Sequence, residues 1–401
     1  MNVIEINSCN FGSTGNIALQ IAEAARKNGM TVYTACPKSR DNQKKTVENQ
    51  IFIGNRISRN IHLKLAKLTG LNGCFSVFST IFFLRKLKKI KIDLIHLHNL
   101  HNCYINLPLL FRFIKKHNLK TVWTLHDCWA FTGHCPHFTL AKCDRWKNGC
   151  GVCPQYKRYP GAYIDRTGQM FKKKKRWFTG VKDMTLVTPS QWLCDLVKQS
   201  FLKDYPVKVI NNGINLNVFK PTESDFREKH LIDAEKKLLL GVSFGWSERK
   251  GLDVFIELAK RLSDEKYRIA LVGADERTDS VLPENIIAVS RTQNQKELAE
   301  IYTAADLFIN PTREENYPTV NMESLACGTP VLTFNTGGSS EIPDESCGSS
   351  VTCDDLDMLI KEINRICESA PYSKAACINR AQSFNMTDRF TEYINLYEKV
   401  K

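Results

Sequence analysis

Long hydrophobic runs are absent from this sequence of 401 residues. The longest apolar stretch, Cys74 to Leu84, is about half the length of a helix that spans a bilayer, so we expect no transmembrane segment. The chain begins with a strand-like run and not with a charged leader and an apolar core, so we also expect no secretory signal and a cytoplasmic protein. With 43% hydrophobic and 24% charged residues, the composition excludes a disordered or fibrous chain and is sufficient for two ordinary domains.

Acidic residues are scarce in the first half of the chain. Residues 1–204 carry 33 basic and 11 acidic side chains, a net charge of +22, whereas residues 205–401 carry −8, so that the total is +14. A basic excess is typical of proteins that bind nucleic acid or an anionic membrane, but here it belongs to one half only. Apolar and basic residues alternate from Phe82 to Lys91, and Met170 to Trp177 holds a basic run flanked by aromatic residues. Each segment is either a solvated helix face or a surface that rests on an anionic bilayer, and we expect the second.

Short β-branched runs alternate with segments of helical period along most of the chain, which is the pattern of parallel sheets covered by helices. The predicted strands are 3–6, 31–35, 93–97, 120–125 and 186–188 in the first half, and 238–243, 268–272 and 307–310 in the second. The predicted helices are 17–27, 107–116, 252–262 and 295–304. The sequence therefore predicts an α/β fold of two doubly wound Rossmann-like domains, 1–210 and 211–383, that face each other across a cleft. Ligands of such sheets bind at the carboxyl ends of the strands.

Two glutamates stand eight positions apart after the strand predicted at 307–310. Glu315 lies in the loop, and Glu323 falls inside the helix that follows. The free amides and dipole of that helix would suit a diphosphate, and a carboxylate one or two turns further could accept hydrogen bonds from ribose hydroxyls. The alternative is a solvated helix start whose glutamates only complement the dipole.

The wider motif decides between these interpretations. Glu315 and Glu323, followed by Ala-Cys-Gly-Thr-Pro-Val and by Gly337-Gly338-Ser-Ser-Glu-Ile, resemble the retaining glycosyltransferases of family 4, which have the GT-B fold. The stretches 212–215 and 304–307 are similar to the family's interdomain connection and to the strand entry before its donor loop. The resemblance covers nearly the whole chain and implies that a final helix, 384–401, crosses back to the first domain.

The resemblance also implies roles for the residues of the donor loop. In this family Glu323 would bind the donor ribose and Glu315 would hold hydroxyls of the transferred sugar. Amides near Tyr317, Thr319 and Val320 would meet the diphosphate. Pro318 stands where the family commonly has glycine, and because proline has no N–H, one expected backbone donor is missing.

Cations are expected beside the diphosphate, because a fixed positive charge stabilises the leaving nucleoside diphosphate. Lys250, which precedes Gly251, fits the family's lysine, whereas its usual arginine position is occupied by Gly245. Arg249 is the candidate substitute. The alternative for both cations is a solvated helix start.

Two further motifs lie in the first domain. His126 ends a strand in a His-Asp pair, and the family resemblance makes it a donor-sugar contact, whereas a lone histidine is more often structural. Gly12 and Gly15 form a loop after the first strand that lets a substrate approach backbone amides, although it lacks the full glycine pattern of dinucleotide binding. The candidate catalytic residues are thus His126, Glu315 and Lys250, and Gly12, Gly15, Arg249, Lys250, Glu315, Tyr317, Thr319, Val320 and Glu323 are the candidate donor-binding residues.

A cysteine-rich insertion, 127–156, interrupts the first domain. Four cysteines lie within nineteen residues: Cys135, Cys143, Cys150 and Cys153. They resemble a zinc knuckle, and a structural zinc ion would supply folding free energy to a long irregular loop. The alternative is a set of reduced cysteines that pack as small hydrophobes, because only one Cys-x2-Cys pair is present. The insertion resembles that of a bacterial subgroup associated with capsule and exopolysaccharide assembly.

We therefore expect a retaining hexosyltransferase that requires no cofactor for catalysis. Its partners would be a nucleotide-sugar donor, a glycan or lipid-linked acceptor in capsule, exopolysaccharide or lipopolysaccharide synthesis, and the inner face of the cell membrane. Nucleic acid is not an expected partner. The alternatives are a zinc-containing nucleic-acid-binding protein, which would not explain the acidic second half, and a nucleotide-sugar epimerase of the same fold.

Overall fold

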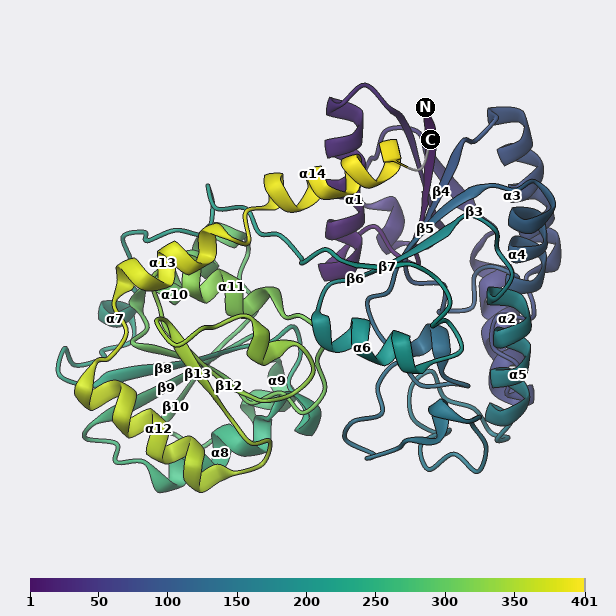
Figure 1. The fold of residues 1–401 in the computed structure, drawn as a ribbon. Helices are drawn as coiled ribbons and strands as arrows, with labels where there is room; N and C mark the ends of the chain where they lie inside the picture. Colours follow the sequence, from purple (N-terminus) through teal and green to yellow (C-terminus); the bar gives the residue numbers. More distant parts are fainter. Residues whose placement is uncertain (400–401) are drawn as a thin grey trace. The chain divides into compact units, whose positions relative to one another are not determined.

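The computed structural model describes residues 1–399 and divides the chain into two α/β units (Figure 1). The first unit comprises Met1–Asn211 and the chain from Arg389 on, and the second comprises Asn212–Asp388. Both sheets are parallel throughout their named strands, so the α/β fold class predicted from the sequence is confirmed.

The sheet of the first unit has seven strands in the order β3-β2-β1-β4-β5-β6-β7. Its strands are β1 (Asn2–Ile6), β2 (Thr31–Pro37), β3 (Gln50–Ile53), β4 (Leu94–Leu97), β5 (Lys120–Thr124), β6 (Met184–Thr188) and β7 (Val207–Val209). Its helices are α1 (Gly12–Lys27), α2 (Arg56–Thr69), α3 (Val77–Ile90), α4 (Leu107–Lys116), α5 (Thr167–Phe178) and α6 (Gln191–Gln199). The strand order reverses between β1 and β4, which makes the carboxyl ends of these two strands the switch point of the sheet.

The sheet of the second unit has six strands in the order β10-β9-β8-β11-β12-β13. Its strands are β8 (Lys237–Val242), β9 (Tyr267–Val272), β10 (Ile286–Val289), β11 (Leu307–Asn310), β12 (Val331–Phe334) and β13 (Gly348–Val351). Its helices are α7 (Phe226–Lys229), α8 (Leu252–Arg261), α9 (Glu276–Asp279), α10 (Gln295–Ala304), α11 (Thr319–Ala326), α12 (Leu356–Ser369) and α13 (Lys374–Gln382). Here the order reverses between β8 and β11, so the loops after these strands meet at the switch point.

Local chemistry explains where many of the helices begin. Asn106, for example, accepts a hydrogen bond from the Leu109 N–H and caps α4, and a proline occupies the first turn of that helix. The helix then buries Leu107, Leu110, Phe111 and Ile114, its apolar stripe, in the core of the first unit.

The long segment between β5 and α5 is irregular apart from two single 3-10 turns, Trp129–Phe131 and Arg145–Lys147. Aromatic side chains hold it against the core of the first unit. Phe131 and Trp146 are buried, and the ring of Phe138 stacks on Trp146 at a centroid distance of 5.0 Å. The insertion is therefore an integral part of the first unit and not a loose appendage.

The last helix, α14 (Met386–Lys399), lies within the predicted crossover helix 384–401, whose final two residues are outside the described part of the chain. From Arg389 on it belongs to the first unit, where Tyr393 and Tyr397 are buried. Within residues 1–399, no helix combines the length and the apolar character needed to cross a membrane.

Candidate functional site

The predicted donor residues of the second unit gather where β8 and β11 end. Lys250 closes the loop after β8, Glu315 lies in the loop after β11, and their side chains form an ion pair. Gly251 adopts a positive φ of 77°, and a Cβ there would lie 2.5 Å from the carbonyl oxygen of Pro311. Glycine is thus required for the two loops to approach each other.

Arg313 fastens the loop after β11 to its neighbours. Its guanidinium donates to both carboxylate oxygens of Asp253, at 2.8 and 2.7 Å, and to Asp354 at 2.6 Å. The hydrogen bonds to Asp253 raise the pKa of Arg313, so the cation is permanent. Sequence reasoning missed this residue, because its partners are 60 and 41 positions away in the chain.

The carbonyl side of the Glu315 loop is packed against the two glycines of the sequence motif. A Cβ on Gly337 would lie 1.8 Å from the Glu315 carbonyl oxygen, and the Gly338 N–H donates to the Asn316 carbonyl at 2.7 Å. Any other residue at position 337 would displace the loop that carries Glu315. Glycine is therefore required at this position of the motif for steric reasons.

Helix α11 supplies the predicted amides. It begins at Thr319, immediately after Pro318, and its first turn has no acidic side chain to offset the dipole. The carbonyl oxygen of Tyr317 accepts a hydrogen bond from the Asn212 side chain at 3.0 Å, which fixes the approach to the helix. The amides of Thr319 and Val320 thus lie at a helix N-terminus that favours an anion.

Glu323 lies on the buried side of α11, with 9% of its surface exposed. The Tyr302 hydroxyl donates to its Oε2 at 3.4 Å. Burial raises the pKa of Glu323 to about 7, because the charged form loses its water, while hydrogen bonds from Thr319 and Tyr302 oppose the shift. A carboxyl group in this state can both accept and donate hydrogen bonds near neutral pH.

Arg249 is also bound to the loop after β11. Its guanidinium donates to the Glu314 carbonyl at 3.1 Å, and its own carbonyl accepts from the Arg313 N–H at 2.9 Å. The structure thus brings both predicted cations, Arg249 and Lys250, to the same loop as Glu315.

A large cavity in the second unit does not coincide with this site. A cavity of about 570 Å³ lies at the opposite, amino-terminal edge of the sheet, where Lys237, Asp306 and Pro330 line it. None of the predicted donor residues borders that cavity. We therefore locate the site by its chemistry and by the strand order.

In the first unit, Gly12 and Gly15 serve different purposes at the start of α1. Gly12 has a positive φ of 69° with open space around its Cα. A Cβ on Gly15 would lie 2.8 Å from the Asn10 backbone, so this glycine lets the helix pack on the preceding loop.

His126 follows β5 and, together with His98 and Asp127, borders a small pocket. Its Nε2 lies 3.0 Å from Nδ1 of His98. Asp127 Oδ2 lies 3.0 Å from Nε2 of His101. Burial alone would raise the pKa of Asp127, but His101 lowers it to about 2.

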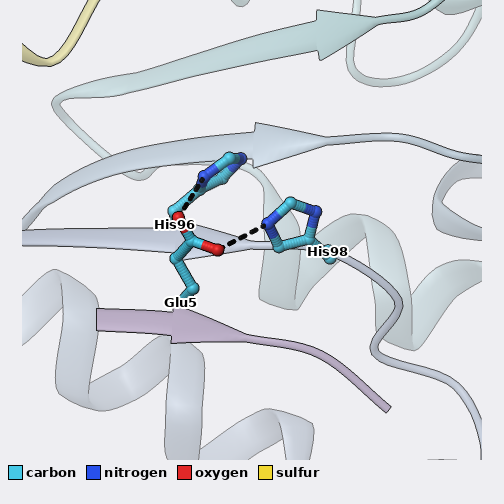
Figure 2. Close-up of side chains that lie close together, drawn as sticks. All are labelled: Glu5, His96 and His98. Carbon is cyan, nitrogen blue, oxygen red and sulfur yellow. Dashed lines mark ion pairs between the residues drawn. The ribbon is translucent and has the colours of Figure 1, made fainter. Parts of the chain in front are cut away.

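A buried cluster of Glu5, His96 and His98 lies at the switch point of the first sheet (Figure 2), and His98 contacts His126. Glu5 of β1 stands between His96 of β4 and His98 just after it. Within residues 1–399 these three form the only group of three or more potential metal ligands whose donor atoms all lie within 4.8 Å of one another. The sequence signal was the alternation of two histidines in an apolar strand, which directs both side chains to one face.

The four predicted zinc ligands, Cys135, Cys143, Cys150 and Cys153, border one common pocket. The Gly133 N–H donates to the Cys150 sulfur at 3.1 Å, as it would to a thiolate ligand. No three of these sulfurs lie within 4.8 Å of one another in the described chain. The structure thus places the four side chains around one pocket, with the sulfurs further apart than in a closed metal site.

The basic run on α5 differs from the expectation of a membrane-facing segment. Met170, Phe171, Trp177 and Phe178 are buried, and the Lys174 ammonium, also buried, donates to the Trp129 and Thr132 carbonyls at 2.6 and 3.1 Å. These aromatic residues are therefore not available to a bilayer, whereas Lys172, Lys175 and Arg176 are exposed, so contact of the basic run with a membrane stays a prediction. Phe178 packs on Phe111 and Trp123 of the core, and Lys174 joins α5 to the cysteine-rich insertion.

Family models cover most of the chain. The model described as Glycosyltransferase Family 4 matches residues 14–218, and the one described as Glycosyl transferases group 1 matches residues 222–384. A protein named as a putative colanic acid biosynthesis glycosyl transferase, WcaC of Escherichia coli, is 25% identical over 308 residues, which cover 74% of each chain. A D-inositol 3-phosphate glycosyltransferase of Thermobispora bispora is 30% identical over 151 residues, 33% of this chain and 35% of that protein.

Solved structures with the GT-B fold are similar over the full length. Sucrose-phosphate synthase from Thermosynechococcus elongatus has a TM-score of 0.73 at 18% identity. The superposition covers 100% of this chain and 98% of the synthase chain. HepE from Anabaena, solved with UDP-glucose, has a TM-score of 0.68 at 15% identity, with both chains covered completely. WaaG, described as a glycosyltransferase of lipopolysaccharide biosynthesis, has a TM-score of 0.66 at 18% identity, covering 98% of this chain and 99% of its own. These similarities show two Rossmann-like domains of the GT-B type.

Proposed function

The chain belongs to glycosyltransferase family 4, and we propose that it is a retaining enzyme that moves a hexose from a nucleotide-sugar to a glycan. The observation that carries the proposal is the meeting of Lys250, Glu315 and the N-terminus of α11 at the switch point of the second sheet. A cation and helix amides suit the diphosphate, and carboxylates suit hydroxyl groups. HepE, of the same fold, was solved with UDP-glucose, which supports a nucleotide-sugar as the donor class.

In the proposed reaction the bond between the anomeric carbon and the diphosphate oxygen breaks. The acceptor oxygen forms its new bond to that carbon on the same face, so the configuration is retained. The proton of the acceptor hydroxyl passes to the leaving phosphate oxygen. Lys250 and the amides of Thr319 and Val320 stabilise the charge of the leaving nucleoside diphosphate, while Glu315 and His126 orient the sugar.

The proposed pathway is the synthesis of a bacterial surface polysaccharide. The printed functions of WcaC, in colanic acid biosynthesis, and of WaaG, in lipopolysaccharide biosynthesis, support this class of acceptor. We also propose a lipid-linked acceptor at the inner face of the cell membrane.

An exposed apolar face on the first unit supports peripheral attachment to that membrane. Ile57, Ile61 and Leu68 of α2 are 70%, 53% and 54% exposed, and Phe78 and Phe82 of α3 are 78% and 65% exposed. A contact of 2.8 Å between His62 Nδ1 and Ser76 Oγ joins α2 to the start of α3. Exposed Arg56, Lys64, Lys67, Arg85, Lys86 and Lys89 accompany these apolar residues. Apolar side chains among basic ones suit an anionic bilayer.

We also propose that the cysteine-rich insertion holds a structural zinc ion. Four thiols around one pocket supply the soft donors that zinc prefers, and the sulfurs would have to approach one another to close the site. Burial lowers the pKa of Lys174 to about 7, and Cys150 and Cys135 oppose this shift, so thiolates in the pocket would favour the charged lysine, which would partly offset their negative charge. The ion would stabilise the insertion and take no part in sugar transfer.

A donor screen tests the central proposal. Purified protein is incubated with nucleotide-sugars that differ in base and hexose, and released nucleoside diphosphate is measured, with Glu323→Ala as the negative control. Turnover or tight binding of at least one donor by the native protein and not by the variant is the expected result. If no nucleotide-sugar binds or reacts, the proposed function is wrong.

A further inference from the structure

The buried cluster at the switch point of the first sheet has no role in the proposed function so far. Parallel pairing of β1 with β4 sets Glu5 opposite His96, and Glu5 lies 3.9 Å from His96 Nδ1 and 3.6 Å from His98 Nε2 (Figure 2). Glu5, His96 and His98 are 2%, 0% and 1% exposed. Burying three polar side chains in the core of a sheet costs free energy unless they are hydrogen-bonded, so their presence there calls for an explanation.

His98 connects the cluster to His126. His98 Nδ1 lies 3.0 Å from His126 Nε2, and the two rings stack with an interplanar angle of 18°. Burial lowers the pKa of each imidazole to about 3, so both rings are neutral and each carries one N–H. One proton is shared between the two facing nitrogens, so the tautomer of His98 determines the tautomer of His126.

On its other side, His98 faces Glu5. Neither Glu5 Oε2 nor His98 Nε2 has a hydrogen-bond partner among residues 1–399, although both atoms are buried. They lie 3.6 Å apart, so a small approach would join them and satisfy both.

His96 is occupied elsewhere. Its Nδ1 lies 2.6 Å from the Tyr397 hydroxyl and its Nε2 lies 2.8 Å from the Thr124 hydroxyl. With both of its nitrogens bonded, His96 leaves the Glu5 Oε2 to His98.

We propose that Glu5 is a positioning residue for His126, which it holds, through His98, in one tautomer and one orientation. The inference rests on the proposed function, in which His126 contacts the donor sugar. Glu5 itself touches neither substrate nor reacting atoms.

The direction of the hydrogen bonds follows from the burial of Glu5. Burial raises the pKa of its carboxyl group well above the usual range, against the smaller effects of Arg26 and Tyr397, which favours the protonated form that can donate a hydrogen bond. In the proposed arrangement the 3.6 Å gap closes, Glu5 donates to His98 Nε2, and His98 donates from Nδ1 to His126 Nε2. His126 consequently carries its own proton on Nδ1, and each of the three groups holds one proton.

Two substitutions of Glu5 test the proposal. Glu5→Gln keeps a donor, since its amide N–H can replace the carboxyl proton, whereas Glu5→Met has similar length and no hydrogen-bonding group. The readout is the tautomer of His126 in long-range 1H–15N spectra of histidine-labelled protein without substrate, assigned with His126→Gln. Thr34→Val, on β2, controls for a packing change beside the cluster, because Thr34 pairs with Glu5 in the sheet and is also a buried polar residue whose hydroxyl has no partner among the described residues.

We expect His126 with its proton on Nδ1 in the native protein, in Glu5→Gln and in Thr34→Val. In Glu5→Met we expect a mixture of tautomers and a kcat that falls about tenfold to a hundredfold, with the donor KM within about threefold, as for other residues that orient a functional imidazole. His98→Met interrupts the same chain of hydrogen bonds and should give the same result if Glu5→Met does not fold.

Three results would overturn the proposal. The first is a His126 tautomer that stays the same in folded Glu5→Met and His98→Met. The second is a proton on Nε2 of His126 in the native protein. The third is one equivalent of metal ion in the native protein that is absent from Glu5→Met, because Glu5, His96 and His98 would then be ligands. If the native protein turns over no donor, the proposed function fails, but the spectra still decide the role of Glu5.

Discussion

The Lys250 ammonium and the Glu315 carboxylate are paired with each other at the edge of the second sheet. Both side chains are about three-quarters buried, at 23% and 22% exposure, in a site whose ligand would carry a diphosphate and several hydroxyl groups. A bound donor would exchange this pair for two better partners, the diphosphate for Lys250 and the sugar hydroxyls for Glu315. The pair therefore holds both residues in place before the donor arrives.

This exchange predicts opposite effects on nucleotide binding. Lys250→Met should weaken the binding of UDP or GDP and lower kcat/KM for the donor about a hundredfold, because the leaving charge loses a fixed cation. Glu315→Gln should lower turnover as strongly, yet bind the nucleoside diphosphate at least as tightly, because Lys250 is released. Calorimetry and diphosphate release measure the two effects.

Lys260→Met is the control for this pair, since Lys260 forms an exposed ion pair with Glu257 on α8, 3.3 Å long. It should leave binding and turnover unchanged. Equal loss of nucleotide affinity in Lys250→Met and Glu315→Gln would contradict the exchange.

Glu323 gives the protein a pH-dependent stability. Because burial raises its pKa from 4.5 to about 7, the folded protein keeps a proton there that the unfolded chain releases. The stabilisation that this bound proton gives the folded protein is fully present below pH 4.5 and is lost as the pH rises to 7. The free energy of unfolding of the native protein should therefore decrease by up to about 3 kcal/mol across this range relative to Glu323→Gln. Urea titrations of both proteins at several pH values measure it, and parallel pH profiles would refute the assignment.

The proposed zinc ion predicts a selective effect of cysteine substitution. Cys150→Ser and Cys153→Ser should each lose about one equivalent of zinc and lower Tm, because the insertion loses its cross-link. Cys194→Ala, a buried cysteine on α6 outside the insertion, should keep the metal. Elemental analysis of reduced protein prepared without chelator is the measurement. Less than half an equivalent in the native protein would exclude the site.

Vesicle binding should depend on the apolar face of α2 and α3. The double variant Phe78→Ser, Phe82→Ser should lose co-sedimentation with anionic vesicles about tenfold or more while keeping its Tm, because both rings are exposed. Leu231→Ser, at a residue 92% exposed in the second unit, is the matched control and should bind as the native protein does. Binding that depends on neither anionic lipid nor salt would contradict a basic membrane surface.

The α/β pattern, the donor loop and its helix could be predicted because they are local in sequence. Periodicity marks β8, β11 and the other long elements, and Glu315 and Glu323 stand within one short motif. The meeting of Lys250 with Glu315 then follows from the strand order, since loops after neighbouring strands share one edge of a parallel sheet.

Other features depend on contacts that composition and spacing do not encode. Arg313 looks like an ordinary surface cation until Asp253 and Asp354 are placed around it. Lys174 belongs to a run of lysines that reads as solvent-exposed, yet the helical period turns this one residue inward, over the ring of Trp129 at 3.3 Å. Glu5 acquires its partners only through the register of β1 against β4.

The last helix sets the order in which the molecule can be completed during synthesis. The Tyr397 hydroxyl of α14 lies 3.4 Å from Glu5 Oε1, so α14 completes a core that includes β1. At about 5–20 residues per second, a ribosome needs roughly tens of seconds to synthesise the second unit, and during this time the first unit still lacks α14. The sheet of the first unit therefore keeps Glu5 and His96 incompletely covered until α14 has been synthesised and can pack against it.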